Sequence, residues 1–476
     1  MRNLSLLMIV VLVLGLPLAA QTSYILTASP NNVQGVVDRH GLTVVKELFD
    51  GTNCVMLVTS PSSNLTGVET EVESDIQVAS FEPEQSTVLP ELNGLTQPTL
   101  TQSSTSILDG LVGRTLVSFF GSIVPSNYTT QNAASIIRLS DARTASKLTG
   151  AGIVAIIDTG ADPNHPALAG VLVPGYDFTR DTPGFSELAD LDPDVAAQLT
   201  QSSTSILDAQ NTLQLNSSAM AILSQSSTSI LDQSSTSILD STLAEFGHGT
   251  MVAGVVHLIA PTAKIMPLKA FRADGSSNLS DIIRAIYYAA DHGANVISMS
   301  FSIAQPSPGL QAAVQYALNK NVVLVAASGN DGLKTLVYPA SYNSVIGVGS
   351  STNADLRSTF SNFGSGVVIF AAPGEGIVTT FPGGNYAAGW GTSFSAPMVA
   401  GAASLVLQAR PTSKPGDIQN GLSKTKQIGD MGYGRIDLYQ SLTNLVNSSG
   451  SSPSTSGTGI SPTSGSNSSG TSVKLP

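Results

Sequence analysis

The sequence predicts an α/β protein with a doubly wound, mostly parallel sheet and helices on both faces. Near-continuous apolar runs at 152–157, 295–300 and 322–328 suit central parallel strands, which are covered on both sides. Helical patterns at 279–293 and 308–321 alternate with these runs, as a doubly wound sheet requires. Ligands gather at the carboxyl ends of the strands in such a sheet, so we expect the functional residues there.

The composition is that of an acidic and sparsely charged chain. Its 476 residues include 21 Lys and Arg against 33 Asp and Glu, which gives a net charge of −12, and only 11% of the residues are charged. The length suffices for one large domain or two smaller ones. The acidic balance argues against nucleic acid and against an anionic membrane surface as partners.

Residues 1–20 have the pattern of a signal peptide for secretion. Arg2 supplies a positive start, an apolar stretch covers 6–16, and small residues lead to cleavage after Ala20. An uncleaved membrane anchor is the alternative, but the apolar stretch is short of the roughly 20 residues that a span needs. We therefore expect a secreted, extracellular protein that has no membrane span once the signal is removed.

Residues 21–86 are expected to form a small α+β module. A strand pattern at 23–29 is followed by a helical pattern at 31–41, and Asp50-Gly51 marks a hairpin turn. Cys54, the one cysteine of the chain, follows in an apolar strand. A single thiol forms no internal disulfide, so we expect a buried and inert cysteine.

Three further zones complete the expected domain organisation. Residues 87–125 are rich in Ser, Thr, Gln and Pro, and we expect a linker there. Residues 126–446 carry the alternating apolar pattern of the large domain. Residues 447–476 have almost no apolar content, so they cannot bury a core and are expected to be disordered.

Four polar residues of the large domain fall at strand ends or helix starts. Asp158 and Asn330 follow apolar strands, whereas His248 and Ser393 begin helical patterns. A hydrolytic serine needs a base for its proton, and the base needs a buried carboxylate that fixes its tautomer. Donors at a helix N-terminus or on an asparagine amide can face a developing oxyanion. Each residue alone has a structural alternative; serine, for example, is more often a helix N-cap.

The motifs around these residues resemble those of the subtilisin-like serine proteases. "DTG", "GHGT" and "GTSFSAP" occur in the order Asp, His, Ser, and subtilisin itself is the standard example of that order. "NHPAL", "PGYDF", "YPASYNSVIGVGS" and "APGEGI" match as well, so the resemblance covers roughly 140–440. Residues 22–86 resemble the inhibitory pro-segment of the family, with "VASFEPE" as the quoted match.

The resemblance implies a role for each matching residue. Asp158 orients His248, His248 is the general base and acid, Ser393 is the nucleophile, and Asn330 completes the oxyanion hole. The peptide-binding residues that it implies are Gly275, Ser276, Ser277, Ser300, Phe301, Ser302, Ala327 and Gly329. The family often has glycine where Ser277 and Ser302 stand, so we expect their side chains to crowd the cleft.

The chemistry implied by the resemblance needs no cofactor. Structural calcium is common in the family, but the spacing of acidic residues fixes no calcium site. The candidate calcium ligands are Asp162, Asp177, Asp181 and Asp355. His165, His257 and His292 are expected to be structural, because no His/Cys spacing indicates zinc or another metal.

The expected function is that of a secreted, monomeric serine endopeptidase, made as a zymogen and self-processed. Its expected partners are polypeptide substrates and its own pro-segment. A protease-derived surface or binding protein with an occluded cleft is the alternative. A lipase-like hydrolase does not fit, because Ser393 lies in "GTSFS" and not in G-x-S-x-G.

The octapeptide QSSTSILD occurs four times, once in the expected linker and three times in a stretch at about 184–243. That stretch is surplus between Asp158 and His248 when compared with subtilisin, so we expect an insertion near the active site. One interpretation is a passive low-complexity loop. The other is that a single active site cuts within or beside the copy at 102–109 and the copies in the insertion.

Overall fold

The computed structural model describes residues 22–62, 64–89, 115–191, 193, 214–215, 220–223 and 245–449. The expected signal peptide and all four octapeptide copies lie outside these residues. Most of the expected tail also lies outside them, but its first three residues belong to the last helix, which ends at Ser449.

The small N-terminal module has an antiparallel sheet in the order β2-β3-β1-β4, with two helices. The strands are β1 (Ser23–Ala28), β2 (Thr43–Asp50), β3 (Cys54–Thr59) and β4 (Val78–Pro83), and the helices are α1 (Val33–Arg39) and α2 (Leu65–Glu73). β2 and β3 form the hairpin expected at Asp50-Gly51, whereas α2 was not expected. A separate core that includes Tyr24, Val58 and Phe81 holds the module together.

A ten-stranded sheet is the centre of the large domain, in the order β10-β9-β13-β8-β15-β16-β17-β18-β22-β21. Its strands are β8 (Ile153–Asp158), β9 (Tyr176–Asp177), β10 (Thr182–Pro183), β13 (Lys264–Lys269), β15 (Val296–Met299), β16 (Val323–Ala327), β17 (Val345–Ser351), β18 (Phe370–Pro373), β21 (Thr425–Lys426) and β22 (Arg435–Ile436). The eight inner strands are parallel and only the edge strands β10 and β21 are antiparallel. The predicted fold class is therefore confirmed.

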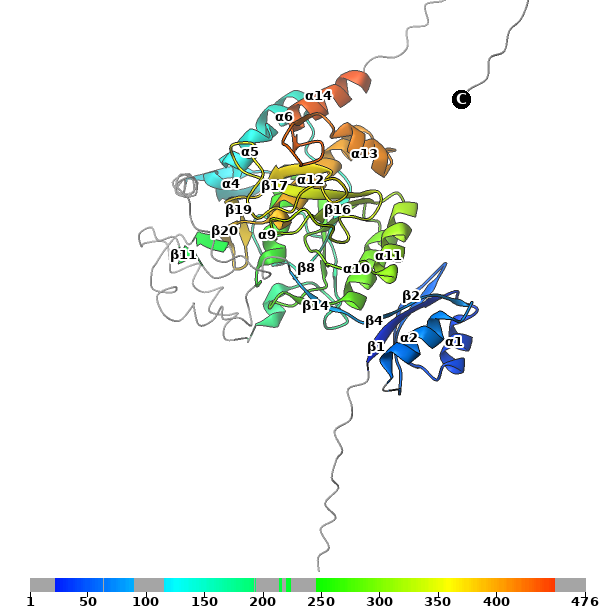
Figure 1. Cartoon of the computed structure of the whole chain (residues 1–476). Coiled ribbons are helices and arrows are strands. Elements are labelled where there is room, and N and C mark those ends of the chain that lie inside the picture. The colour runs from blue at the N-terminus through cyan, green and yellow to red at the C-terminus, as the bar shows by residue number, and fades with distance from the viewer. Residues whose placement is uncertain are drawn as a thin grey trace, which may run out of the picture.

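Helices cover both faces of this sheet (Figure 1). Helices α9 (His248–Ile259) and α12 (Thr392–Ala409) contribute to one hydrophobic core, and α10 (Leu279–Asp291) and α11 (Pro308–Asn319) to the other. Among the described residues, the other helices of the large domain are α4 (Ser126–Thr130), α5 (Asn132–Ile136), α6 (Leu139–Ser146), the 3₁₀ helix η2 (Glu187–Asp190), α13 (Pro415–Gly421) and α14 (Leu438–Ser449). Within the described residues, no helix combines the length and apolarity that crossing a membrane requires.

Short strands outside the main sheet correct two expected boundaries. The expected linker is wrong for its last part, because β6 (Leu116–Phe119) and β7 (Ser122–Pro125) form a hairpin. Phe119 and Val124 from this hairpin are buried in the large core, a burial that the Ser/Thr-rich composition of the whole stretch concealed. At its start, the linker overlaps β5 (Ser86–Val88), which pairs with β14 (Ser276–Asn278) of the large domain.

The expected insertion is likewise partly built into the domain. Its first residues include η2, in which Glu187 is buried, and the next residue, Leu191, is buried as well. Further along, β11 (Gln214–Leu215) and β12 (Met220–Leu223) extend the hairpin of β19 (Ile377–Phe381) and β20 (Asn385–Gly389) into a four-stranded sheet. The stretch therefore begins as a packed segment and not as an exposed loop.

Candidate active site

Asp158 and His248 form a buried pair where strand β8 meets helix α9. Asp158 is the last residue of β8 and His248 the first of α9, and His248 Nδ1 lies 2.7 Å from Asp158 Oδ1. Both side chains are at most 1% exposed. The backbone N–H of Thr159 donates to the same carboxylate oxygen at 2.7 Å, so the carboxylate is held from two sides.

The two glycines that flank His248 permit this approach. Gly247 has a φ of +92°, a conformation that side-chain-bearing residues rarely adopt. A Cβ on Gly249 would lie only 2.1 Å from the carbonyl oxygen of Gly160. The first turn of α9 therefore packs on the backbone just after Asp158, which no larger residue at position 249 would allow.

Ser393 lies in the first turn of α12 and is locked to the end of strand β15. Its hydroxyl donates to the carbonyl oxygen of Ser300 (3.1 Å), and the hydroxyl of Ser300 donates to the carbonyl oxygen of Ser393 (2.9 Å). Pro397, four residues on, has no N–H, so the Ser393 carbonyl lacks its helical donor and Ser300 supplies one. The ring of Phe394 lies 5.6 Å from the His248 ring, which places this turn beside the histidine.

Asn330 is anchored to the residue that precedes Ser393. Its Oδ1 accepts hydrogen bonds from the backbone N–H (2.9 Å) and the hydroxyl (2.8 Å) of Thr392. These bonds fix the orientation of the amide and leave Nδ2 as its donor side. Sequence reasoning missed Thr392 as a partner of Asn330, although it stands in the quoted "GTSFSAP" motif.

Strand β5 of the same chain occupies the edge of β14. Ser276, Ser277 and Asn278 pair antiparallel with β5, and the N–H of Leu89 donates to the carbonyl oxygen of Gly275 at 3.0 Å. The expectation that the Ser277 side chain crowds the cleft is wrong. Its hydroxyl donates to the carbonyl oxygen of Ala270 at 2.7 Å, so the side chain points into the domain and is 1% exposed.

The second expected peptide-binding segment lies just after strand β15. Phe301 is fully buried, with its ring 5.3 Å from that of Phe271, while Ser302 is only half-buried. Ala327 ends β16, and Gly329 has a φ of +90°. A Cβ added to Gly329 would meet the amide of Asn362 at 2.5 Å, so a glycine is required there.

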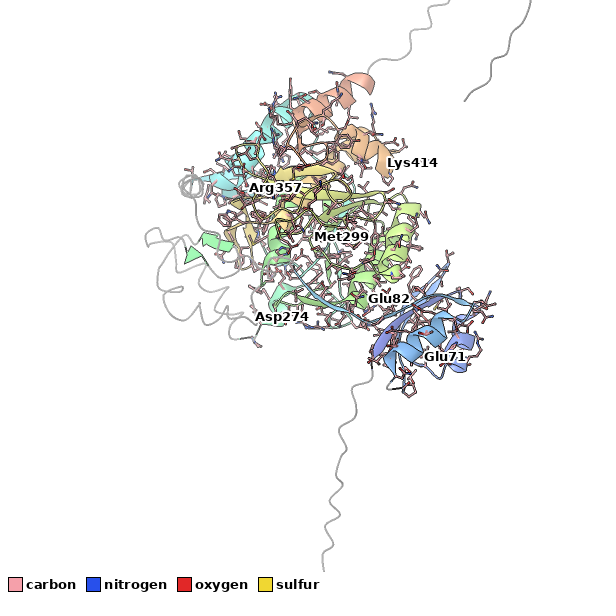
Figure 2. The ribbon with its side chains drawn as sticks, viewed as in Figure 1. Glu71, Glu82, Asp274, Met299, Arg357 and Lys414 are labelled. Carbon is pink, nitrogen blue, oxygen red and sulfur yellow. The ribbon has the colours of Figure 1, made fainter. Side chains whose placement is uncertain are left out.

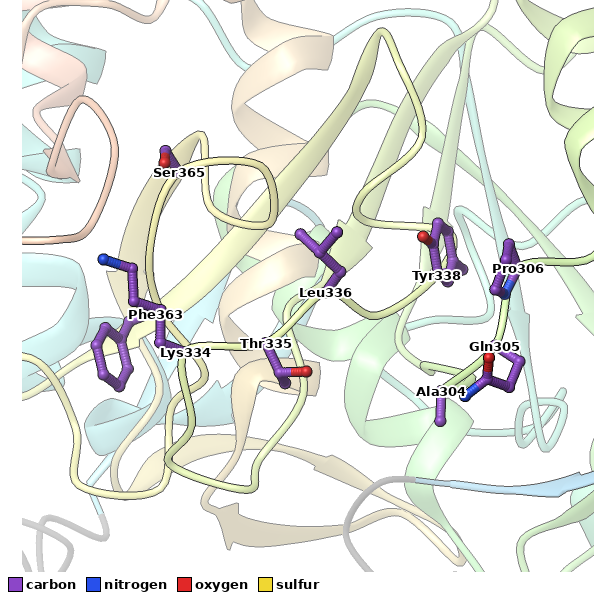
Figure 3. A pocket seen from close by; sticks show the side chains of 9 residues that line it. All are labelled: Ala304, Gln305, Pro306, Lys334, Thr335, Leu336, Tyr338, Phe363 and Ser365. Atoms are coloured by element: carbon purple, nitrogen blue, oxygen red, sulfur yellow. The ribbon is translucent and has the colours of Figure 1, made fainter.

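A surface pocket of about 430 Å³ begins two residues after Ser302 (Figure 3). It is lined by Ala304, Gln305, Pro306, Lys334, Thr335, Leu336, Tyr338, Phe363 and Ser365. The backbone of its lining residue Tyr338 pairs with that of Ile303, with N–H to carbonyl distances of 2.7 and 2.9 Å. The pocket thus adjoins the segment that carries Phe301 and Ser302.

The four candidate calcium ligands do not form a shared site. Asp177 pairs with Arg180, Asp181 with Lys46 and Arg284, and Asp355 with Arg435, whereas Asp162 accepts two backbone N–H groups. Across the described ranges, no three His, Cys, Asp or Glu side chains gather in the way that a metal site requires.

The three other histidines of the large domain and the cysteine lie in structural surroundings. His165 Nε2 lies 2.9 Å from the carbonyl oxygen of Asn385, and His257 is buried edge-on against Phe119. The ring of His292, on the surface, stacks on Tyr288 at 3.6 Å. Burial, together with the nearby carboxylates of Glu47 and Asp50, raises the pKa of the Cys54 thiol to about 11. The thiol is therefore protonated and unreactive at neutral pH.

Comparison with known proteins identifies the family. The model of the subtilase family (Peptidase_S8) matches residues 150–458. A thermophilic serine proteinase from Bacillus sp. (strain AK1) is 35% identical over 295 residues, which cover 61% of this chain and 61% of the proteinase. Thermitase from Thermoactinomyces vulgaris is 33% identical over 302 residues, which cover 61% of this chain and 88% of thermitase.

The fold is shared with a solved structure, that of fervidolysin from Fervidobacterium pennivorans, described as a keratinolytic enzyme related to subtilisin. The match has a TM-score of 0.59 at 22% identity and covers 89% of this chain and 61% of fervidolysin. The chain therefore spans about three fifths of both the Bacillus proteinase and fervidolysin. On the strength of the family match, which extends over more than half of its residues, this chain belongs to the subtilase family.

Proposed function

We propose that this chain is a serine endopeptidase in which Asp158, His248 and Ser393 form the catalytic triad. The observation that carries the proposal is the buried contact of 2.7 Å between His248 Nδ1 and Asp158 Oδ1. A proton on Nδ1 leaves Nε2 as the acceptor for the hydroxyl proton of Ser393. The Ser393 hydroxyl donates to the carbonyl oxygen of Ser300 in this structure, so its proton must be redirected toward His248 before that transfer.

Stabilisation of the oxyanion is assigned to two donors. The backbone N–H of Ser393 lies in the first turn of α12, where N–H groups have no helical acceptor and the helix dipole favours negative charge. The Nδ2 group of Asn330 is the second donor, because Thr392 holds the other side of the amide. Donors that are fixed before the reaction stabilise the charge that develops in the transition state.

Substrate binding is proposed to follow the pairing that the chain already makes with itself. β5 adds a strand to β14, the mode in which several peptide-binding domains hold an extended peptide at a sheet edge. The side chain of Leu89 is fully buried at the end of this pairing. A substrate segment in the same register would meet the same apolar surroundings.

The small module is proposed to be an inhibitory pro-segment, with β5 as the strand that blocks the cleft. Glu82 accepts hydrogen bonds from the hydroxyl of Ser307 (2.9 Å) and the N–H of Gly309 (2.7 Å), where α11 begins. Glu84 accepts from the N–H of Ser280 (3.0 Å), where α10 begins. Carboxylates are favourable at helix N-termini, so the module is electrostatically suited to this face. Figure 2 shows Glu82 between the module and the large domain.

The pairing of β5 with β14 indicates where a secreted zymogen would cut itself. The expected pro-segment boundary at residue 86 falls inside β5, and the strand that lies along β14 ends near Leu89. We therefore favour a first cut soon after Leu89. Cleavage at the octapeptide copy at 102–109 then becomes a separate and later event. Self-processing, secretion and a monomeric state remain parts of the proposal.

Occupation of β14 by the chain itself also favours a second candidate, a binding protein with an occluded cleft. The two candidate functions differ in whether Ser393 is reactive once the module has been removed. The test is to incubate the purified secreted protein with a fluorophosphonate and to locate the label by mass spectrometry. The proposal expects the label on Ser393 and none on the Ser393→Ala variant. A protein that has lost the module and stays unlabelled would instead be a binding protein.

A further inference from the structure

A second buried carboxylate, that of Glu187, lies beside the Asp158–His248 pair. Glu187 is the first residue of η2 and is 1% exposed. One of its oxygens accepts from the N–H of Gly249 (3.1 Å) and from the hydroxyl of Thr159. The other accepts from the N–H (3.2 Å) and the hydroxyl of Thr250. Four hydrogen-bond donors on one buried carboxylate hold that side chain in a fixed position.

These bonds cap the helix that begins with His248. The first N–H groups of an α-helix have no partner inside the helix, and those of Gly249 and Thr250 are among them in α9. Glu187 satisfies both and places its carboxylate at the positive end of the helix dipole. Removal of the cap would leave the Gly249 N–H with only the Thr159 hydroxyl as acceptor, take away the acceptor of the Thr250 N–H, and loosen the turn on which His248 stands.

Thr159 joins this cap to the carboxylate partner of His248. Its N–H donates to Asp158 Oδ1 at 2.7 Å, and its hydroxyl accepts from the N–H of Gly249 at 2.9 Å while bonding to Glu187. Asp158 and His248 are therefore connected twice, once by their direct contact and once through Thr159 and Glu187. The second connection sets how the start of α9 sits against the end of β8.

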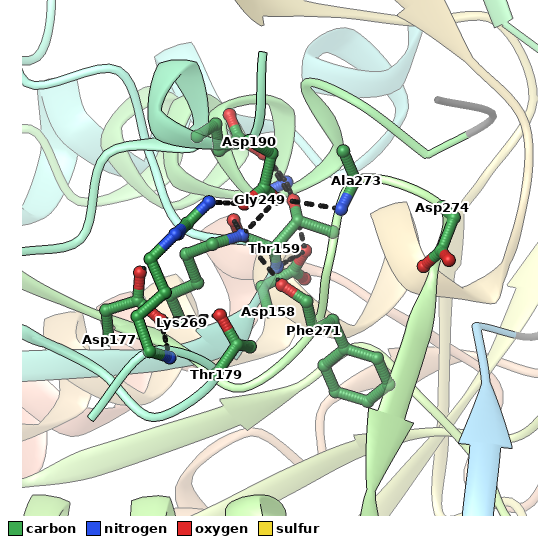
Figure 4. Close-up of polar contacts among 12 residues, drawn as sticks. Asp158, Thr159, Asp177, Thr179, Asp190, Gly249, Lys269, Phe271, Ala273 and Asp274 are labelled. Carbon is green, nitrogen blue, oxygen red and sulfur yellow. Dashed lines mark hydrogen bonds and ion pairs between the residues drawn. The ribbon is translucent and has the colours of Figure 1, made fainter. Parts of the chain in front are cut away.

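The other end of η2 is fixed to the domain by Asp190 (Figure 4). Its Oδ2 accepts from Lys269 Nζ (2.6 Å) and from the N–H of Ala273 (2.8 Å). Lys269 is fully buried and also donates to the carbonyl oxygen of Thr159 at 2.8 Å. An anchored η2 holds Glu187 at a constant position, which a cap on a loose loop would not do.

We propose that Glu187 is a positioning residue for His248, supplied by the segment that leads into the octapeptide-bearing stretch. Its carboxylate holds the first turn of α9 so that the imidazole keeps its geometry toward Asp158. The inference rests on the triad proposed above. It gives the residues before the repeats a function in the active site, whatever the repeats themselves do.

The test compares Glu187→Gln and Glu187→Ala with wild type in the purified secreted enzyme. Glutamine keeps the shape but replaces one acceptor oxygen with a donor, so the N–H of either Gly249 or Thr250 loses its bond to residue 187. We expect kcat to fall about 10- to 100-fold, with the larger loss for alanine, because small misplacements of catalytic groups have effects of that order. KM should change less than about twofold, since Glu187 does not touch the edge of β14.

Asp190→Asn is the matched control on the same short helix. Asparagine keeps one oxygen that can accept from both Lys269 and the N–H of Ala273, so η2 stays anchored, but the negative charge beside the buried Lys269 is lost. The thermal midpoint should therefore fall while kcat stays near wild type. Equal losses of kcat in the Asp190 and Glu187 variants would assign Glu187 a merely structural role and overturn the inference. Unchanged kcat in both Glu187 variants would overturn it as well.

A measurement that does not depend on catalytic activity can test this inference independently of the proposed function. The NMR resonance of the His248 Nδ1 proton reports the contact with Asp158. We expect it to shift or broaden in Glu187→Gln and to persist in Asp190→Asn. If wild type hydrolyses no peptide but the resonance behaves in this way, the proposed function fails and the positioning role stands. An unchanged resonance in Glu187→Gln would contradict the positioning role directly.

Discussion

Two regions of the molecule meet the large domain through carboxylates at helix N-termini, namely the small module and η2. The module brings Glu82 to α11 and Glu84 to α10, and η2 brings Glu187 to α9. The module has a core of its own and packs a second set of apolar side chains, Ile25, Leu48 and Val55, against the large domain. η2 has no such core and is tied by Asp190 to the buried Lys269.

Under the proposed function, a carboxylate at a helix N-terminus serves a contact that is released with the module in one region and a permanent contact in the other. A carboxylate on a separately packed module can leave together with that module. A carboxylate between two segments of one core can leave only if the core opens. The following predictions test this contrast and the site between the two regions.

The largest expected effect is that of Ser393→Ala on peptide hydrolysis. Loss of the nucleophile should lower kcat about 10⁶-fold, which is the magnitude known for subtilisin itself. Steady-state hydrolysis of a chromogenic peptide by the enzyme freed of its module measures it. A variant that keeps more than a hundredth of the wild-type rate would show that another residue is the nucleophile.

Asn330→Ala should have the next largest effect. We expect kcat to fall about 10²- to 10³-fold, or about 3–4 kcal/mol, with little change in KM, because the donor meets charge that develops in the transition state. Thr392→Val, which removes one of the two bonds that hold the amide, should act in the same direction but more weakly. A loss confined to KM in either variant would place Asn330 in substrate binding instead.

The detachable contact should respond to pH. Burial raises the pKa of Glu82 and of Glu84, and hydrogen bonds from the helix starts lower it only in part. A pKa that is higher in the docked state means that docking takes up protons. Docking is then most favourable below the ordinary glutamate pKa and weakens as the pH rises through the raised values.

Size-exclusion chromatography of the cleaved zymogen between pH 4 and pH 8 tests whether docking of the module weakens as the pH rises. We expect the module to stay bound at acidic pH and to dissociate more readily at neutral pH. Glu82→Gln, which has no charge to remove, should flatten the dependence. A module that binds more tightly as the pH rises would show that the helix dipoles outweigh the cost of burying the carboxylates.

The smallest expected effect is that of a reductant. Cys54, the one cysteine of the sequence, is buried in the module, so the mature enzyme should contain no disulfide. Its thermal midpoint should be the same with and without dithiothreitol. A clear decrease with reductant would mean that residue 54 stays with the mature enzyme in an intermolecular disulfide.

The sequence alone sufficed to predict those strands and site residues that belong to local sequence patterns. Apolar runs such as 152–157 predicted the central strands, and the glycines around His248 marked a close approach. Asp158 and His248 could be paired from the family motifs, and the structure places them in contact.

Contacts between distant segments could not be predicted in this way. Glu187 lies 62 residues from Gly249, in a stretch whose composition indicated an exposed insertion. The direction of the Ser277 side chain depends on which face of β14 meets the domain, and a sequence fixes only the alternation of faces. The hairpin of β6 and β7 was not predicted because the linker was inferred from the Ser/Thr-rich composition of residues 87–125 as a whole, and two short strands change that composition little.

The most direct test of a self-processing endopeptidase is a time course of fragment masses from the purified full chain, with Ser393→Ala in parallel. The account predicts that wild type releases a fragment that ends soon after Leu89 before any cut at 102–109, and that the variant stays intact. Release of the same fragment from Ser393→Ala at the wild-type rate, in a host that lacks other proteases, would contradict it.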